Sequence, residues 1–600
     1  MPWPAIASSA GEATDSDVFF CFFRSIHPLG QSSRDPTVCH SLLTLCYQKE
    51  TPLYTKRALL ILATIVASAL ALAGCGSSPN ASGGGGGGGN STLVVVTPDT
   101  SWTWALDNGF GGLEPSMNVV GATLVRNPYK ATGKNGIIAQ NVSKYEPYLA
   151  KSWTVSKDSK VITFHLSDAV SEQGNPITSD DVIWSWERRF NSPTSISPSI
   201  QAPQITAIKQ FHKIDDKTFT VTLAQPGYLS TFFGLIANVT AYIYDAKYLK
   251  AHATPSDPYA VKFSTTHPNY GFGPYSETNY QPGVSATLTA NSNFVLGAPK
   301  VKTIFYKIVP DEGTRVNLLK SGDADVALDI APSDLVNLQE GPDTAILSAP
   351  NPNSYMEMPL LANNPPFNNA LVRQAMEYAI PYNQIIQNVF HGLAFRKSPG
   401  FLRSDAPGYD GSGFTDFTYD PAKAKALLAR AGVSTPVSYT LTVSAAEPDM
   451  QEAAVQIQTY AKASGFNITI KQVPASAFGQ GRTDHTFQAF LLLDYSITLT
   501  PSYELNVYTA KNSDGSPAGN NLGAWVDPAF YAAKAKADAL ADPYTPAAGK
   551  LWNAAERIFI DQAPIAFVAQ IQPTTGFRTD VKGITWRSDQ WIDWSQASKG

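Results

Sequence analysis

The sequence predicts a mixed α/β fold, and three observations lead to it. Short runs with an apolar residue at every second position indicate strands. Between them lie longer runs whose apolar residues recur every three or four positions, as on one face of a helix. Two of these runs begin with an Asp-Pro pair, which is typical of helix starts, and no strict internal repeat is visible.

The first half of the predicted body is rich in strands. Residues 92–98 form a β-rich run, and residues 152–166 read as a hairpin in which alternate apolar side chains share a face. A second hairpin is predicted at 211–223. Between the hairpins, residues 178–190 read as a helix capped by Ser179, with acidic residues in the first turn that suit the positive end of the helix dipole.

In the second half, helix and strand patterns alternate. Asp420 is a helix cap, Pro421 suits the first turn and Gly432 ends the helix. The predicted helices are 314–321, 369–379, 420–431, 449–464 and 527–541, and the predicted strands are 324–330, 437–444 and 466–473.

Length and composition describe a large globular protein. A chain of 600 residues predicts about three or four domains. The formal net charge of −5 gives no electrostatic reason to expect a nucleic-acid partner. The 11% aromatic content fits core packing, and it also fits a ligand cleft rich in rings.

The start of the chain predicts export and anchoring. Lys56 and Arg57 precede the apolar run 58–73, which is short for a membrane-spanning helix and is typical of a signal segment. The run ends in Leu-Ala-Gly-Cys75, which resembles the bacterial lipobox and implies lipid attachment at Cys75. An ordinary signal or anchor helix that contains a cysteine is the alternative. Residues 76–91 read as a flexible Gly/Ser linker.

Two further expectations concern the cysteines and the N-terminus. The other cysteines, Cys21, Cys39 and Cys46, all precede Cys75, so the exported body is expected to contain no disulfide. Residues 1–55 lie upstream of the signal, and we expect that they reflect a start codon assigned too early. Lipidation places the protein on the outer face of the cytoplasmic membrane.

Signatures of catalysis are absent from the sequence. There is no His-Glu-x-x-His, Gly-x-Ser-x-Gly, Cys-x-x-Cys or Walker phosphate loop, and the eight histidines are scattered. The glycines of 271–276 read as a turn that enters a strand. We therefore expect a protein that is not an enzyme and has no cofactor or metal site.

Four blocks of sequence together resemble a known family. They are 145–190, 271–283, 300–328 and 363–380. In order and spacing they resemble the family 5 solute-binding proteins of ABC importers, which include oligopeptide-, dipeptide- and nickel-binding proteins, and the resemblance spans nearly all of the chain from residue 92. Local departures occur at 171–174 and 381–382, where the family usually has Phe-His-Asp-Gly and Asp-Arg.

The resemblance implies a two-lobed, periplasmic-binding-protein-like α/β fold of class II, with a hinge and an additional domain. Solute binds in the cleft between the lobes, and the closed form, a monomer, docks on an ABC permease and its ATPase. The expected boundaries are extension 1–55, signal 56–75, linker 76–91, lobe I 92–125 with 235–320 and 555–600, additional domain 126–234, and lobe II 321–554.

The resemblance also implies site residues. In peptide binders of the family, an aspartate in an Asp-Tyr pair after an apolar strand holds the α-ammonium of the ligand, and Asp494-Tyr495 stands at the matching place. Asn118 belongs to a stretch that resembles the early cleft loop, and Tyr355 matches a strand that approaches the cleft. The alternatives are a strand-end cap for Asp494 and structural roles for the others.

Several functions remain open from sequence. The first is peptide import. The same fold also suits an oligosaccharide, a metal chelate or an opine-like compound. A lipid-tethered hydrolase or adhesin, and a surface receptor that does not transport, are further alternatives. A hydrolase would need a nucleophile and base, and an adhesin would typically show repeats; the sequence displays neither.

Overall fold

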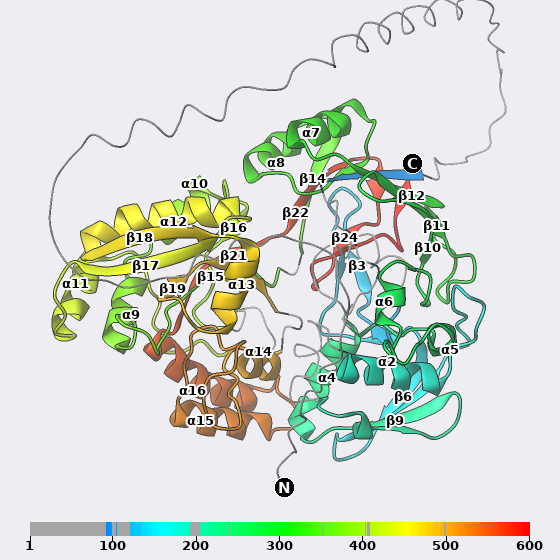
Figure 1. Cartoon of the computed structure of the whole chain (residues 1–600), viewed down its shortest axis with the longest axis horizontal. Coiled ribbons are helices and arrows are strands. Elements are labelled where there is room, and N and C mark those ends of the chain that lie inside the picture. The colour runs from blue at the N-terminus through cyan, green and yellow to red at the C-terminus, as the bar shows by residue number, and fades with distance from the viewer. Residues whose placement is uncertain are drawn as a thin grey trace, which may run out of the picture. The chain divides into compact units, whose positions relative to one another are not determined.

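The structure of the protein is a computed structural model (Figure 1). The predicted N-terminal extension, the signal segment with Cys75, the linker and the cleft-loop residue Asn118 lie outside the residues that it describes. Those residues are 92–98, 102, 104, 121–192, 205–238, 241–350, 352–401, 404, 408–496, 498 and 500–600.

Lobe I is built on a seven-stranded mixed sheet whose order is β10-β11-β12-β1-β13-β22-β14. The run TLVVVT predicted as a strand is β1, and it pairs in parallel with β12 on one side and β13 on the other. Its near-continuous apolar sequence suits a strand covered on both faces. The strands are β1 (Thr92–Thr97), β10 (Tyr275–Gln281), β11 (Ser285–Ala290), β12 (Thr303–Ile308), β13 (Val326–Ala327), β14 (Thr344–Ser348) and β22 (Thr574–Arg578).

Helices and small sheets complete lobe I. α7 and α8 pack on the β14–β22 end of the large sheet (Figure 1). Four two-stranded ribbons of the described residues pair β2 with β5, β3 with β4, β23 (Val581–Lys582) with β26 (Ser598–Lys599) and β24 with β25. Their bounds are α5 (Ala246–Ala251), α6 (Val261–Ser264), α7 (Glu312–Ser321), α8 (Pro332–Gln339), β2 (Val125–Arg126), β3 (Tyr129–Ala131), β4 (Ile138–Gln140), β5 (Glu146–Pro147), β24 (Thr585–Trp586) and β25 (Ile592–Asp593).

Both predicted hairpins join in one four-stranded antiparallel sheet, β6-β7-β9-β8. Their buried faces pack with α2 and α4 around a core that includes Phe164, Trp186 and Phe219. The cap of α2 is Thr178 and not the predicted Ser179, because Asp181 Oδ2 accepts hydrogen bonds from the Thr178 N–H and hydroxyl at 2.7 and 2.8 Å. The elements are β6 (Ala150–Val155), β7 (Val161–Leu166), β8 (Phe211–Lys213), β9 (Thr218–Thr222), α2 (Ser179–Asn191) and α4 (Leu229–Ile236).

Lobe II contains two sheets, with orders β18-β17-β19 and β16-β21-β15-β20. α12 lies along β17 and β18, and α15 packs beside α16 (Figure 1). The strands are β15 (Ser354–Pro359), β16 (Ala394–Phe395), β17 (Val437–Ser444), β18 (Phe466–Val473), β19 (Ala489–Phe490), β20 (Leu492–Tyr495) and β21 (Ile565–Ile571). The helices are α9 (Ala370–Glu377), α10 (Tyr382–Asn388), α11 (Pro421–Arg430), α12 (Pro448–Ala461), α13 (Ala475–Thr483), α14 (Pro501–Val507), α15 (Pro528–Asp538) and α16 (Pro546–Gln562).

The chain passes between the two lobes where β14 is followed by β15 and where β21 is followed by β22. β13 and β14 are hydrogen-bonded into the sheet of lobe I, although they follow the expected boundary at residue 320. β21, which follows the expected boundary at residue 554, pairs with β15 in lobe II. We therefore propose that the lobe boundaries lie in these two connections.

Candidate functional site

Antiparallel pairing of β20 with β15 brings Asp494 and Tyr355 together. Tyr355 lies directly opposite Asp494, and Glu357 lies opposite Leu492. Directly opposed residues share a face of the sheet, as do residues two apart along one strand. Tyr355, Glu357 and Asp494 therefore project from the same face, so the predicted ligand-binding carboxylate has a second carboxylate close by.

Asp494 is partly buried and lacks a counter-ion. Its Oδ1 accepts a hydrogen bond from the Tyr495 N–H at 2.8 Å. Burial raises the pKa of Asp494, whereas the Arg482 guanidinium, that N–H and the Tyr508 hydroxyl oppose the rise. Within the described part of the chain, no lysine or arginine forms an ion pair with Asp494. A carboxyl group in this situation either takes up a proton or can be stabilised by a cation from outside the protein.

Tyr355 is a buried residue that connects the strand beside Asp494 to helix α14. The side chain is fully buried. Its hydroxyl donates to Oε1 of Glu504 at 3.1 Å, and the Ser496 hydroxyl donates to the same oxygen at 2.7 Å. Glu504 belongs to α14, so these bonds tie that helix to β15 and to the end of β20. The burial of Tyr355 favours a supporting role over direct contact with a ligand.

Glu357 and Lys397 are polar residues of this region that sequence reasoning missed. Glu357 is fully buried, and within the described residues neither carboxylate oxygen has a hydrogen-bond partner. Burial, and next the charge of Asp494, raise the pKa of Glu357 well above its usual range, while Lys397 opposes them. The Lys397 ammonium lies 4.9 Å from the ring centre of Tyr355 and donates to the Gly400 carbonyl at 2.9 Å. The sequence feature that could have indicated Glu357 is a glutamate within the otherwise largely apolar strand SYMEMP.

Tyr495 projects from the opposite face of β20 and lies near lobe I. Its partner across the strands is Ser354, whose hydroxyl donates to Oε1 of Gln590 at 2.7 Å. Burial, the charge of Asp494 and the charge of Asp589 all raise the pKa of Tyr495. Asp589 and Gln590 lie in the turn between β24 and β25 of lobe I. β15, the strand that pairs with β20, is therefore hydrogen-bonded to the C-terminal hairpin of the other lobe.

The described ranges contain neither a cluster of metal-ligating side chains nor a helix suited to cross a membrane. No group of three or more His, Cys, Asp and Glu side chains there is arranged to hold a metal ion. No helix among the same residues has the length and apolar character needed to cross a bilayer. Asn118 and Cys75 lie outside these ranges, so their predicted roles stay predictions.

The profile of the bacterial extracellular solute-binding proteins, family 5, matches residues 144–516, which is well over half of the chain. The chain belongs to this family. Membership confirms the family predicted from the four sequence blocks, and it confirms solute binding as the function. The two-lobed α/β fold expected of a family 5 protein is the fold that the structure has.

Similar family 5 proteins differ in what their names say they bind. The heme-binding protein A of Haemophilus influenzae is 26% identical over 62% of this chain and 68% of its own length. The dipeptide-binding protein of Escherichia coli is 24% identical over 73% of this chain and 83% of its own length. The structure of the binding protein DppA from Helicobacter pylori, in complex with the peptide STSA, superposes with a TM-score of 0.69 at 20% identity, covering 85% of this chain and 98% of that one.

Proposed function

We propose that this family 5 protein captures peptides for an ABC importer and holds the peptide α-ammonium on Asp494. The observation that carries the proposal is the partly buried Asp494 carboxylate, which no cation of the described residues pairs. An ammonium group supplies the charge and the hydrogen-bond donors that such a carboxylate lacks. The dipeptide-binding relative and the peptide-bound structure support this ligand class.

Capture is a binding event that leaves the solute intact. A peptide that contacts Asp494 in lobe II and groups in lobe I stabilises a closed arrangement of the lobes, which shifts the population toward that state. The two connections between the lobes, from β14 to β15 and from β21 to β22, are the segments that would change backbone conformation during closure. The closed form then docks on the permease of the importer.

We further propose that the mature protein is a monomer anchored through lipid on Cys75, at the outer face of the cytoplasmic membrane. The lipobox-like Leu-Ala-Gly-Cys75 and the Gly/Ser linker at 76–91 support this. A flexible tether lets the binding body reach the permease while lipid holds it at the membrane.

The second candidate ligand class is a metal chelate, which the heme-binding relative supports. Native mass spectrometry of the full chain, purified in detergent from the cells that make it, distinguishes the two classes. We expect released peptides after denaturation. A released chelate or sugar, with no binding of added peptides, would keep the solute-binding function and overturn the peptide ligand. Loss of labelled-peptide uptake on deleting the gene tests import against a receptor role.

A further inference from the structure

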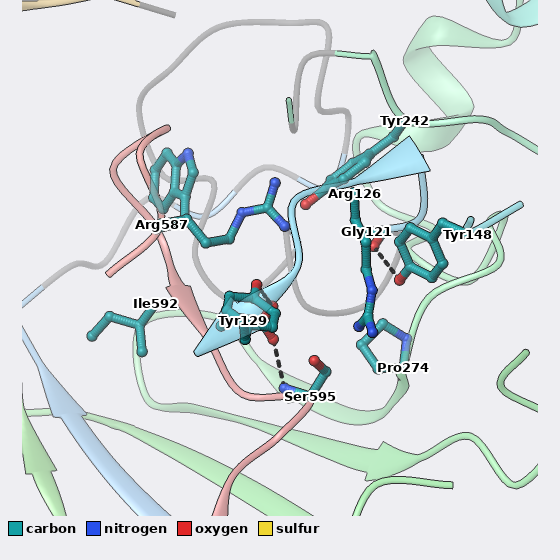
Figure 2. A pocket seen from close by; sticks show the side chains of 11 residues that line it. Gly121, Arg126, Tyr129, Tyr148, Tyr242, Pro274, Arg587, Ile592 and Ser595 are labelled. Carbon is teal, nitrogen blue, oxygen red and sulfur yellow. Dashed lines mark hydrogen bonds between the residues drawn. The ribbon is translucent and has the colours of Figure 1, made fainter. Parts of the chain in front are cut away.

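A small pocket in lobe I lies where β2, β3 and the C-terminal hairpin β24–β25 meet (Figure 2). Figure 2 shows the Arg587 side chain directed at the Tyr242 hydroxyl, and the Arg126 side chain extending toward Pro274. No residue of this pocket was predicted from sequence to bind a ligand. Its walls are formed chiefly by Arg126, Tyr129, Tyr148, Tyr242, Arg587 and Asp593.

The Arg587 guanidinium is fixed by hydrogen bonds through two of its nitrogens, and its third nitrogen has no partner among the described residues. Its Nε and Nη2 donate to the two carboxylate oxygens of Asp589 at 2.8 Å each, and Nη2 also donates to the Ala237 carbonyl at 3.2 Å. The side chain is only 11% exposed. Within the described residues, Nη1 has no hydrogen-bond partner. A fixed guanidinium with a free N–H edge is a preorganised donor for an oxyanion.

Arg126 presents a second free edge. Its Nε donates to Glu146 Oε1 at 2.7 Å, which leaves Nη1 and Nη2 without partners in the described part of the chain. The guanidinium carbon lies 5.9 Å from the ring centres of both Tyr129 and Tyr148, so the two rings hold the group in place.

The acceptor and hydroxyl groups of the pocket are already in use. Tyr129 donates to Asp593 Oδ2, and Asp593 Oδ1 accepts from the Ser595 N–H at 2.7 Å. The Tyr148 hydroxyl donates to the Gly121 carbonyl at 3.0 Å. The groups left to bind a ligand are the two guanidinium edges and the indole N–H of Trp591, which also lines the pocket and has no hydrogen-bond partner within the described residues. All of them are donors.

The pocket has room for one small group. Its cavity volume is about 30 Å³. A buried water needs roughly 10–15 Å³ of such space, so the cavity accommodates about two oxygen atoms side by side. Two oxygens facing guanidinium N–H groups are the arrangement that a carboxylate makes with arginine.

We propose that this pocket binds a carboxylate of the imported solute through Arg126 and Arg587. The inference rests on the peptide ligand proposed above and adds that lobe I selects solutes that carry an anionic group. The hairpin turn that follows Arg587 contacts Ser354 through Gln590, and Asp589 acts on Tyr495 next to Asp494. One solute with an ammonium group and a carboxylate can thus engage both lobes.

Calorimetric titration of the full chain, stripped of bound solute, tests the proposal. The probes are dialanine, trialanine and tetra-alanine, each as the free acid and as the C-terminal amide. We expect the wild-type protein to bind at least one free acid about tenfold or more tighter than its amide, the size expected for charge-assisted hydrogen bonds. A dipeptide amide with an aspartate side chain distinguishes a side-chain carboxylate from the terminal one as the bound group.

The variant Arg126→Met removes one guanidinium, and Lys130→Met removes an exposed cation from β3 as the matched control. Arg126→Met is expected to lower affinity for the carboxylate form to that of the amide, while Lys130→Met changes neither. Equal affinity of wild type for acids and amides, with the aspartate peptide no tighter, would refute the carboxylate pocket while leaving peptide binding intact. Equal weakening of acid and amide by Arg126→Met would also refute it. Binding of none of these peptides would overturn the peptide ligand, and this inference with it.

Discussion

Asp494 and Tyr355 stand opposite each other on paired strands, yet they differ in the side chains that they engage. The Tyr355 hydroxyl bonds Glu504, whereas no cation of the described residues pairs Asp494. The same face of the sheet thus contains a hydroxyl that is hydrogen-bonded within the protein and a carboxylate that has no ion-pair partner among the described residues. Four predictions test the ligand-binding role of Asp494, the structural roles of Tyr355 and Glu357, and the lipid anchor at Cys75.

Asp494→Asn removes the charge that the ligand ammonium is expected to meet. A hydrogen bond to a charged group contributes about 1.5–3 kcal/mol, so affinity for peptides should fall roughly 10- to 100-fold. Calorimetry with the tightest-binding peptide measures the change. Asp561→Asn, at an exposed aspartate of the same lobe, serves as control and should bind normally. Unchanged affinity in Asp494→Asn would assign the residue to a strand-end cap.

Tyr355→Phe deletes the hydroxyl that donates to Glu504. We expect the free energy of unfolding to fall by about 1–2 kcal/mol, because a buried carboxylate oxygen loses a donor. Urea denaturation measures this. Tyr460→Phe is the control, since the Tyr460 hydroxyl has no hydrogen bond within the described residues. A large loss of peptide affinity without loss of stability would instead place the Tyr355 hydroxyl on the ligand.

Glu357 should make stability fall as the pH rises. Burial raises its pKa in the folded protein above the unfolded value of about 4.3, so the folded state binds more protons in that window. The contribution is complete below about pH 4.3 and is lost as the pH rises toward the folded pKa, by at most about 1.4 kcal/mol per pH unit.

Glu357→Gln removes this titration. Urea denaturation between pH 4.5 and 7.5 should show the stability of the variant, relative to wild type, increasing with pH. Glu340→Gln, at an exposed glutamate on the surface of lobe I, should show no such trend. A constant difference between Glu357→Gln and wild type would mean that Glu357 is ionised in the folded protein across this range.

Cys75→Ser should abolish lipid attachment while leaving the binding body intact. Membrane fractionation should find the wild type with the membrane and the variant released or retained with its signal uncleaved. The mass of the purified proteins should show acyl groups only on the wild type. Cys46→Ser should behave as wild type. Acylation that survives Cys75→Ser would rule out Cys75 as the lipid site.

Local structure followed from local sequence, and long-range structure did not. The Asp420 cap, the first-turn Pro421 and the strand at 437–444 appear as predicted, because caps and alternation depend on near neighbours. The neighbourhood of Glu357 and Lys397 escaped prediction because it arises only when segments distant in sequence pack together. The same reason explains the lobe boundaries, which depend on which sheet each strand joins.

The residues of the candidate site also differ in whether the sequence could reveal them. Asp494 was identified by resemblance to a family motif, and no spacing within the sequence would have paired it with Tyr355. Arg126 and Arg587 are far apart in the chain and lie in segments with no recognisable motif. Only the meeting of β2 with the C-terminal hairpin reveals that their guanidinium groups share a pocket.

The central position of β1 in the sheet of lobe I affects how the protein can be made. This strand, the earliest one described, has no partner until residues 303–308 and 326–327 have been synthesised, and the sheet is incomplete until residues 574–578 arrive. Pairings between such distant segments form slowly. The large sheet of lobe I therefore cannot be complete while the ribosome is still at work. We expect that this delay leaves the large sheet of lobe I unformed during the export that the predicted signal segment implies.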